Sequence, residues 1–427
     1  MRVLVYSDGP SVPTGFGVVV KNIFLPLIER GLFEEIAFFA VNYDGSPHGL
    51  PVRQWPAFVG ATRDPDPYGR NRFAFMALHG TWNFDLLFVL QDHFTVAPFL
   101  PLLVTELRKQ VTAGQRPPFR TIFYFPLDGR LIKPEWVRWL PEAVEYPVAY
   151  LPFARDALCS MLPVLADRVR VIPHGTNPET FFPVPEAERL TFRRNTLQVA
   201  DDQPLLVSVN RNQPRKDPVS TLQVFARVLE HYPRAVLYMH MNVRDSAGFD
   251  LLSVAAQLRI PAGHVRFPAE FVEGIGIPLD QLNLIYNAAD VFLVTPRGEG
   301  FGLSVTEALC TRRLVIAPAH TSFPWLLADQ RGILVPPLTQ ELIMPLDNDQ
   351  FRPIADVEAT ATQVLWALAN PDAAHAIAET GYAWAVRQSW RDVICPQWEA
   401  LFREADAART GVSNRDALRL KPEDLGL

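Results

Sequence analysis

The chain has 427 residues, of which 48% are hydrophobic and 20% are charged. This length predicts about two to three domains, and the hydrophobic share is enough for two buried cores. The net charge of −6 argues against a general binder of polyanions. Only 3 cysteines occur, at Cys159, Cys310 and Cys395, too far apart in sequence for a disulfide scaffold or a cysteine zinc site.

The first apolar stretch, residues 2–6, is too short for the hydrophobic region of a signal peptide. No run reaches the roughly 18 consecutive apolar residues that a membrane-spanning helix needs. The cysteine content also fits a reducing compartment. The sequence therefore predicts a cytoplasmic protein with no transmembrane segment.

In the first half of the chain, short apolar runs alternate with longer helical stretches. Helices are expected at residues 18–30 and 97–110. Continuous apolar strands flanked by amphipathic helices indicate a parallel sheet that is covered on both faces. The expected strands are residues 3–6, 36–41, 86–90, 121–125, 148–151 and 169–172.

The same pattern then restarts. Two successive α/β series predict two Rossmann-like, doubly wound domains that face each other across a cleft. The expected strands are residues 205–209, 235–240, 265–267, 291–294, 314–317 and 333–335, and the expected helices are residues 218–231, 250–258, 281–288, 304–310 and 355–368. The expected boundaries are 1–185 and 186–390, then a helix at 391–405 that crosses back to the first domain and a polar tail at 406–427.

A glycine-rich loop, residues 7–17, follows the first strand and opens a helix. Gly15 and Gly17 let backbone amides approach a ligand, and the N-terminus of the helix favours an anion. The loop does not have the GxGxxG spacing of dinucleotide-binding proteins. A donor-binding loop and an ordinary glycine-rich turn are both compatible with this pattern.

Two glutamates flank the start of a predicted helix in the second half. Glu299 lies on the loop after the strand at 291–294, and Glu307 lies just over one turn into the helix. Free amides at the start of a helix bind phosphate, and the carboxylates suit the hydroxyls of a sugar and of a ribose. A solvated loop glutamate and a capping helix glutamate are the alternative. The residues expected to bind the donor here are Glu299, Gly300, Phe301, Gly302, Leu303, Ser304 and Glu307.

This segment resembles the donor-binding motif of the retaining GT-B glycosyltransferases of group 1, family 4. Residues 171–177 with Phe182 and Pro183 resemble the family's entry into the second domain, and residues 284–291 resemble the helix-to-strand step before the donor loop. The resemblance covers most of the chain and is specific over residues 171–337. It implies the GT-B fold, a nucleotide-diphosphate sugar as donor and no bound cofactor.

The loop after the strand at 205–209 contains three cations within six residues, Arg211, Arg215 and Lys216. The resemblance implies that Arg211 and Lys216 neutralise the departing nucleotide diphosphate, whereas Arg215 is expected to face solvent. A basic surface turn is the alternative. Because side-chain cations can do this work, no metal is required, and the chain has no histidine pair with zinc spacing.

Two candidates for the acceptor side follow strands of the first domain. The family places a polar residue, often a histidine, at the position of His93, close to the transferred sugar, with Asp92 as a second candidate. A helix-start histidine beside an Asp cap is the alternative. Many members carry a histidine where this chain has Pro126, and Asp128 is the nearby candidate to orient the acceptor or accept its proton.

These residues predict transfer of a sugar from a nucleotide-diphosphate sugar to an acceptor hydroxyl. Arg211, Lys216 and the helix-start amides would stabilise the departing diphosphate, Glu299 would hold the sugar hydroxyls, and Glu307 would hold the ribose. The resemblance implies retention of anomeric configuration. No pair of carboxylates is disposed for a covalent double displacement.

Two other functions stay open. A nucleotide-sugar epimerase or hydrolase of the same fold would use an acid/base set, for which His93 and Asp128 are candidates. A non-catalytic sugar-nucleotide-binding protein would bind without turnover. The oligomeric state is open, and the acceptor is open among saccharides, lipids, proteins, small molecules and modified nucleic acid. Modified nucleic acid is considered because Arg63, Arg70 and Arg72 cluster in the expected loop at 61–72.

Overall fold

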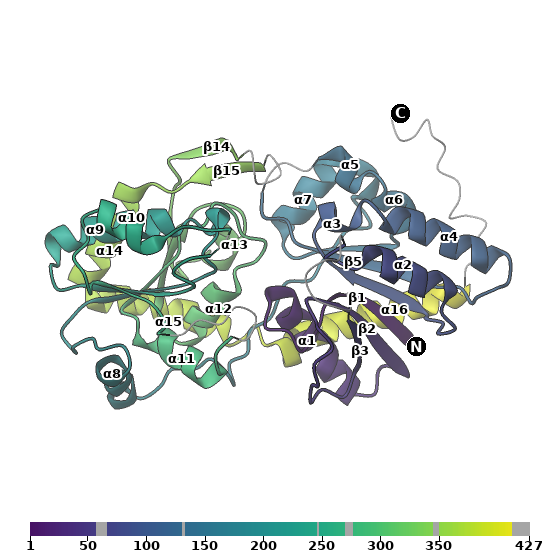
Figure 1. Ribbon diagram of the computed structural model, residues 1–427, viewed down its shortest axis with the longest axis horizontal. Helices are drawn as coiled ribbons and strands as arrows, with labels where there is room; N and C mark the ends of the chain where they lie inside the picture. Colours follow the sequence, from purple (N-terminus) through teal and green to yellow (C-terminus); the bar gives the residue numbers. More distant parts are fainter. Residues whose placement is uncertain (57–65, 130–132, 246, 270–275, 345–349, 412–427) are drawn as a thin grey trace. The chain divides into compact units, whose positions relative to one another are not determined.

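The computed structural model describes residues 1–56, 66–129, 133–245, 247–269, 276–344 and 350–411. The chain divides into two compact units (Figure 1). The first unit comprises residues 1–127, 131–174 and 390–427, and the second comprises residues 128–130 and 175–389. The chain therefore leaves the first unit at residue 174, whereas the sequence placed the boundary at residue 185.

The first unit is built on a seven-stranded sheet in which every pair of neighbouring strands is parallel. The strand order is β3-β2-β1-β4-β5-β6-β7. The strands are β1 Arg2–Asp8, β2 Glu35–Val41, β3 Arg53–Pro56, β4 Leu86–Leu90, β5 Arg120–Phe125, β6 Tyr146–Ala149 and β7 Arg170–Val171.

Side chains alternate between the two faces along each strand, so the apolar strands place side chains on both faces. Helices cover both faces of this sheet. In β4, Leu87 and Val89 belong to the core beneath α2 and α4, whereas the ring of Phe88 contacts Phe24 of α1. The helices are α1 Gly15–Glu29, α2 Arg70–His79, α3 His93–Val96, α4 Leu100–Thr112, α5 Pro134–Val137, α6 Leu140–Ala143, α7 Pro152–Met161, a short 3₁₀ turn at Pro163–Leu165 and α16 Cys395–Gly411.

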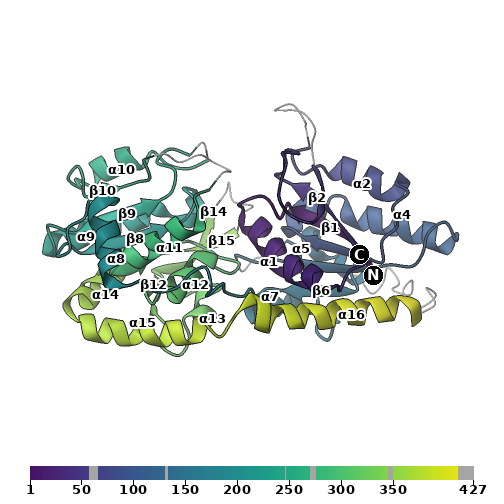
Figure 2. The same ribbon diagram turned by 90° about the horizontal axis from the view of Figure 1, so that it is seen from below.

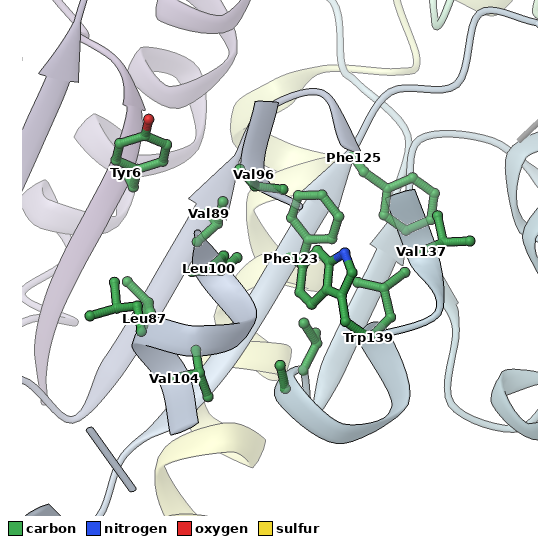
Figure 3. Close-up of a cluster of buried hydrophobic side chains, with 14 of the residues drawn as sticks. Tyr6, Leu87, Val89, Val96, Leu100, Val104, Phe123, Phe125, Val137 and Trp139 are labelled. Carbon is green, nitrogen blue, oxygen red and sulfur yellow. The ribbon is translucent and has the colours of Figure 1, made fainter. Parts of the chain in front are cut away.

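One core of this unit is rich in aromatic side chains (Figure 3). This core includes Tyr6, Phe123 and Phe125 of the strands, Val104 of α4, and Trp139, which precedes α6. All five side chains are buried. Such close packing fixes the strands, and therefore also the loops that follow them.

The last described helix belongs to the first unit. A π-helical turn at Trp390–Ile394 leads into α16, which contacts α1 and β5 (Figure 2). The ring of Trp398 lies 4.7 Å from that of Tyr124, and Phe402 lies 5.6 Å from Phe24. The helix continues to Gly411, so residues 406–411, which the sequence placed in a polar tail, are helical. The expected tail from 412 onward lies outside the described residues.

The second unit is built on a six-stranded parallel sheet with the order β10-β9-β8-β11-β12-β13. A separate antiparallel hairpin, β14 and β15, follows this sheet in the chain. The strands are β8 Leu205–Val209, β9 Val236–His240, β10 Val265–Arg266, β11 Val291–Leu293, β12 Leu314–Pro318, β13 Ile333–Val335, β14 Thr339–Met344 and β15 Gln350–Ile354.

Helices cover both faces of the second sheet as well. Val291 and Leu293 of β11 join the core that includes α9 and α14, whereas Phe292 between them contacts Tyr286 of α11. The helices are α8 Glu186–Asn195, a 3₁₀ turn at Pro214–Lys216, α9 Pro218–His231, α10 Leu251–Gln257, α11 Leu279–Ala288, α12 Leu303–Cys310, α13 Phe323–Leu326, α14 Val357–Ala369 and α15 Pro371–Ala385.

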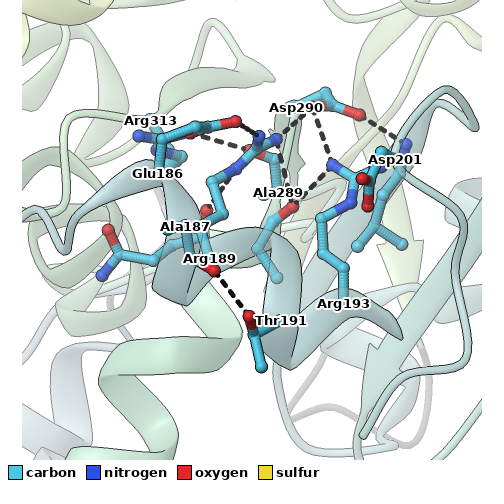
Figure 4. Close-up of polar contacts among 12 residues, drawn as sticks. Glu186, Ala187, Arg189, Thr191, Arg193, Asp201, Ala289, Asp290 and Arg313 are labelled. Carbon is cyan, nitrogen blue, oxygen red and sulfur yellow. Dashed lines mark hydrogen bonds and ion pairs between the residues drawn. The ribbon is translucent and has the colours of Figure 1, made fainter. Parts of the chain in front are cut away.

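Buried guanidinium groups fix the C-terminal end of α11 (Figure 4). Arg189 of α8 donates to the carbonyl oxygen of Asn287 at 3.0 Å, and Arg193 donates to that of Ala288 at 3.1 Å. Both arginines also pair with the carboxylate of Asp290, which follows the helix. These bonds satisfy carbonyls that the end of a helix leaves unpaired, and they set the position of α11.

Most predicted elements lie within a few residues of those observed, and the expected strands 86–90, 205–209 and 333–335 have the observed bounds. The sequence did not predict β3, the hairpin of β14 and β15, or the helices α2, α5, α6, α7, α13 and α15. Of the three arginines that were grouped near the acceptor, Arg63 lies outside the described residues, whereas Arg70 and Arg72 lie in α2. None of the helices in the described part of the chain has the length and hydropathy needed to cross a membrane.

A matched pair of substitutions tests the packing of α16. The side chain of Phe402 is fully buried, whereas that of Phe75 in α2 is 68% exposed. We expect Phe402→Ala to lower the free energy of unfolding of the first unit by about 3–5 kcal/mol, because it leaves a cavity among aromatic rings. Phe75→Ala should change it by less than about 0.5 kcal/mol. Urea unfolding followed by tryptophan fluorescence measures both values, and equal effects would show that α16 is not part of this core.

Candidate functional site

Each sheet has one place where the strand order reverses. This switch point lies between β1 and β4 in the first unit and between β8 and β11 in the second. Ligands of open α/β sheets generally bind at the carboxyl ends of the strands at such a point. The four loops that contain the candidate site residues lie at these switch points. Residues 9–17 follow β1, residues 91–93 follow β4, residues 210–217 follow β8, and residues 294–302 follow β11.

In the second unit, Lys216 and Glu299 form an ion pair between two of these loops. The two residues are 83 positions apart in the sequence, and both side chains are largely buried. Burial lowers the pKa of Lys216, while the carboxylate of Glu299 acts in the opposite direction. The pair brings together the two residue types that the sequence assigned to the diphosphate and to the sugar.

Arg215 lies in the same cluster, so the expectation that it faces solvent is wrong. Its guanidinium donates to the carbonyl oxygen of Gly298 at 2.6 Å and lies 3.6 Å from the carboxylate of Glu299. It also pairs with Asp128 at 3.1 Å. The 3₁₀ turn at Pro214–Lys216 turns Arg215 and Lys216 toward the loop that follows β11.

Hydrogen bonds join the two loops along their length. The backbone nitrogen of Arg297 donates to the carbonyl oxygen of Arg215 at 2.8 Å, and its side chain pairs with Asp217 at 2.9 Å. Asp217 has a φ of 48°, and its side chain caps α9 by accepting from the backbone nitrogen of Ser220. An Asp tolerates this left-handed conformation better than most residues, and the conformation is what ends the 3₁₀ turn beside α9.

Arg211 lies in the same loop but has a different partner. Its guanidinium pairs with Asp245 at 3.1 Å, and half of its side chain is exposed. The neighbouring Asn212 is buried and donates to the carbonyl oxygens of Asn242 and Phe249. The structure therefore places Arg211 at an exposed part of the loop and Lys216 at a buried part.

Asp128, from the short segment grouped with the second unit, lies between two guanidinium groups. Arg352 of β15 is buried and pairs with it at 3.1 Å, and Arg215 pairs with its other oxygen. Burial opposes the charge of Asp128, but the two arginines outweigh burial and hold its pKa below the ordinary value. The close approach of Asp128 requires a glycine at position 298, because a Cβ there would clash with the backbone oxygen of Asp128.

The helix α12 begins directly after Gly302, whose φ is 104°. This left-handed conformation requires glycine and turns the chain so that the amides of the first helical turn, from Leu303 and Ser304 onward, lie at the end of β11. Phe301 beside it is buried, and the backbone nitrogen of Glu299 donates to Thr321 at 3.2 Å. The helix start therefore has the position expected of an anion-binding amide group.

Glu307 lies in the second turn of α12 and receives a hydrogen bond from Tyr286 of α11. The hydroxyl of Tyr286 donates to Oε2 of Glu307 at 2.6 Å. Burial raises the pKa of Glu307 to about 7, and the hydrogen bond from Tyr286 acts in the opposite direction. The side chain of Glu307 is half-buried and is bonded to a neighbouring helix, and not to the start of its own helix as a capping glutamate would be.

In the first unit, Gly15 and Gly17 open α1. Thr14 caps this helix by accepting from the backbone nitrogen of Gly17 at 3.1 Å, and its hydroxyl donates to Asp8 at 2.5 Å. A Cβ at Gly17 would lie 2.2 Å from the carbonyl oxygen of Val12, so only glycine fits there. At Gly15 a Cβ would have space.

His93 follows β4 at the first unit's switch point, as the first residue of α3. Its ring is buried between Phe123 and Phe125, with centroid distances of 5.3 and 4.6 Å. Burial lowers its pKa to about 3, so the imidazole is neutral at physiological pH. Within the described part of the chain, its Nε2 has no hydrogen-bond partner.

A cavity of about 320 Å³ lies elsewhere in the second unit, at the opposite edge of the sheet. Its lining includes the first residues of two strands, Val291 of β11 and Leu314 of β12. The residues identified from the sequence do not line it. We place the candidate site at the carboxyl edge, where the cations and carboxylates meet. In the described ranges, no cluster of three or more His, Cys, Asp or Glu side chains could hold a metal ion.

The structure thus brings Lys216, Glu299, Arg215 and Asp128 together in the second unit. Sequence reasoning missed the contact of Arg215, because charge density alone does not show which way a side chain points. It also missed Arg352, which lies in a hairpin that the sequence did not predict. The hydrogen bond from Tyr286 to Glu307 could not be predicted from the sequence, which showed only that Tyr286 lies in the segment at 284–291.

Comparison with known proteins agrees with this geometry. Residues 191–344 match the family model described as glycosyl transferases group 1. The D-inositol 3-phosphate glycosyltransferase of Segniliparus rotundus is 27% identical over 229 residues, which cover 52% of this chain and 44% of that protein. The enzyme of the same name from Geodermatophilus obscurus is 32% identical over 166 residues, covering 36% and 33%. The chain thus spans less than half the length of these curated relatives.

Solved structures resemble the whole chain. Sucrose-phosphate synthase from Thermosynechococcus elongatus has a TM-score of 0.71 at 19% identity, covering 95% of this chain and 99% of that one. HepE from Anabaena, in complex with UDP-glucose, has a TM-score of 0.70 at 15% identity, covering 95% and 100%. At such identities the likeness shows the fold alone. It confirms the predicted fold class, two parallel-sheet α/β domains of the GT-B type.

The raised pKa of Glu307 predicts a pH-dependent cost to stability. Between the ordinary value of 4.5 and about 7, the folded chain binds a proton that the unfolded chain has released. Stability therefore falls as the pH rises through this window. We expect Glu307→Gln, which avoids this cost, to be more stable than the wild type at pH 8 by at most about 3 kcal/mol.

Urea unfolding at pH 5, 6, 7 and 8 measures this difference, which should shrink as the pH falls below 7. The exposed Glu106 of α4, changed to Gln, serves as the matched control and should show no such trend. A difference between Glu307→Gln and the wild type that is constant from pH 5 to pH 8 would contradict a raised pKa of Glu307.

Proposed function

We propose that the chain transfers a sugar from a nucleotide-diphosphate sugar to an acceptor hydroxyl, with retention of anomeric configuration and without a metal ion. The observation that carries the proposal is the contact of Lys216 with Glu299 beside the start of α12. A diphosphate needs cations and amide donors, and a sugar needs a carboxylate for its hydroxyls. These groups lie together at the carboxyl edge of the second sheet.

In the proposed reaction, Lys216 and the amides of Gly302, Leu303 and Ser304 stabilise the charge that develops on the departing diphosphate. Preorganised donors of this kind usually supply the largest part of such stabilisation. Arg211 adds a second cation by exchanging Asp245 for a phosphate oxygen. Because Lys216 is largely buried, its charge acts where water screens it little.

Glu299 has two proposed partners. In the chain without substrate it neutralises Lys216 and lies near Arg215. With a donor bound, the diphosphate would become the counter-ion of Lys216, and Glu299 would accept hydrogen bonds from the sugar hydroxyls. Its negative charge would also favour the positive charge that develops on the sugar ring.

Asp128 positions Arg215 and does not act as the base that deprotonates the acceptor. Its two guanidinium partners keep it ionised and make it a weak proton acceptor. Deprotonation of the acceptor is therefore assigned to the leaving phosphate, a front-face route that retains the anomeric configuration. His93, neutral at physiological pH, would contribute a hydrogen bond to the sugar or acceptor and no charge.

The proposed location is the cytoplasm, because the three cysteines are free and so fit a reducing compartment. A uridine diphosphate sugar is the first donor to test, since HepE, which shares the fold, was solved with UDP-glucose. The acceptor stays unassigned.

A panel of UDP-, GDP-, ADP- and dTDP-sugars tests the proposal in a thermal-shift assay. We expect one base to raise the melting temperature well above the others, since a specific ligand stabilises the folded state by mass action. That donor should then release free sugar slowly when no acceptor is present, and EDTA should leave the rate unchanged. Stabilisation with no release would indicate a binding protein, and no stabilisation by any donor would contradict the proposal.

Two substitutions test the ion pair. We expect Lys216→Ala and Glu299→Ala each to lower the rate of donor turnover by about 100-fold or more, because each removes a group that acts on developing charge. The exposed pair Lys109 and Glu106 on α4 is the matched control, with a distance of 2.7 Å. Alanine at either control position should leave turnover unchanged. Wild-type turnover by folded Lys216→Ala and Glu299→Ala variants would remove this mechanism.

A further inference from the structure

The hydrogen bond from Tyr286 to Glu307 joins two neighbouring helices of the second unit, α11 and α12. It occupies one oxygen of the carboxylate, Oε2, at 2.6 Å. In the part of the chain that the structure describes, the other oxygen, Oε1, has no hydrogen-bond partner. A carboxylate held in this way has a fixed orientation, because rotation about its last bond would break a short hydrogen bond.

The ring of Tyr286 is itself held rigidly. It is fully buried, with its centroid 5.8 Å from that of Phe181 and 5.4 Å from that of Phe292. The end of α11 is fixed by the bonds from Arg189 and Arg193 to its last carbonyl oxygens (Figure 4). The position of the hydroxyl therefore follows from packing on all sides and not from Glu307 alone.

The same hydrogen bond bears on the charge of Glu307. Burial favours the protonated acid, whereas the hydroxyl of Tyr286 favours the carboxylate. Burial also raises the pKa of Tyr286 well above its ordinary value, so that its hydroxyl remains a donor throughout the physiological range. Cys310, on the same helix, interacts electrostatically with both Glu307 and Glu179. Neither Cys310 nor Glu179 is a cause of the shift in Glu307.

We propose that Tyr286 is a positioning residue for nucleotide recognition: its hydroxyl holds the carboxylate of Glu307 in the orientation in which Oε1 can accept hydrogen bonds from the vicinal hydroxyls of a ribose. This inference rests on the proposed function, in which Glu307 holds the ribose of the donor. It adds a residue that contacts no substrate and acts through Glu307. It also predicts discrimination between ribonucleotides and 2′-deoxyribonucleotides.

The substitution Tyr286→Phe removes only the hydroxyl and tests the proposal. In the protein without ligand, a titration of the Glu307 carboxyl carbon by NMR should show the midpoint rising by about one pH unit, the effect of losing one hydrogen bond to a charged group. Tyr238→Phe, in buried β9 of the same unit, is the matched control and should leave the midpoint in place.

Calorimetric binding of a nucleoside diphosphate and of its 2′-deoxy analogue gives the second readout. We expect the wild type to prefer the ribonucleotide, and Tyr286→Phe to weaken ribonucleotide binding roughly tenfold at pH 7.5, equivalent to about one hydrogen bond. Binding of the deoxy analogue should change little. At pH 9, where Glu307 is ionised in both proteins, the loss should become smaller.

The two readouts separate this inference from the proposed function. A wild-type chain that binds no nucleoside diphosphate would contradict the proposed function, and the ligand-free titration would then decide whether Tyr286 controls the ionisation of Glu307. An unchanged midpoint in folded Tyr286→Phe, together with an unchanged ribose preference, would overturn the inference.

If Tyr286→Phe lowers the melting temperature, the double variant Y286F/E307Q is compared with E307Q. Because E307Q already lacks the carboxylate, adding Y286F should change nucleotide selectivity no further, and a further change would also overturn the inference.

Discussion

The ion pair between Lys216 and Glu299 is the interaction on which the candidate site depends. Because β8 and β11 are hydrogen-bonded neighbours in a parallel sheet, loops that lie 83 residues apart in the sequence start side by side. Two opposite charges in a largely buried place stabilise each other, and removal of one leaves the other uncompensated. The same arrangement suits exchange of partners, since a diphosphate can replace one carboxylate as the counter-ion of Lys216. Arg215 and Asp128 extend the pair into a network that fixes both loops.

Local backbone chemistry supports this network. Asp217 adopts a left-handed conformation that ends the 3₁₀ turn carrying Arg215 and Lys216, and Gly302 adopts one that starts α12. Gly298 leaves room for the backbone of Asp128. Strained or glycine-dependent positions of this kind are common at functional sites, where the chain must present several groups to one ligand. The site is thus specified by short-range turns as much as by the sheet.

The sequence predicted the sheets well because buried parallel strands such as β4 are continuous apolar runs. It missed β3, an edge strand containing Arg53 and ending at Pro56, whose composition is typical of edges and not of central strands. Lys216 and Glu299 could be assigned to one site because the resemblance to the group 1 glycosyltransferases adds to what their charges indicate. The contacts of Arg215 and Tyr286 could not, because a single residue's spacing does not reveal which long-range neighbour its side chain meets.

A crystal structure of the chain with the nucleoside diphosphate that stabilises it tests the central claim most directly. The account predicts the diphosphate at the start of α12, with a phosphate oxygen bound to the ammonium group of Lys216 and with Glu299 released from that ion pair. A nucleotide bound elsewhere, with the contact between Lys216 and Glu299 intact, would contradict it.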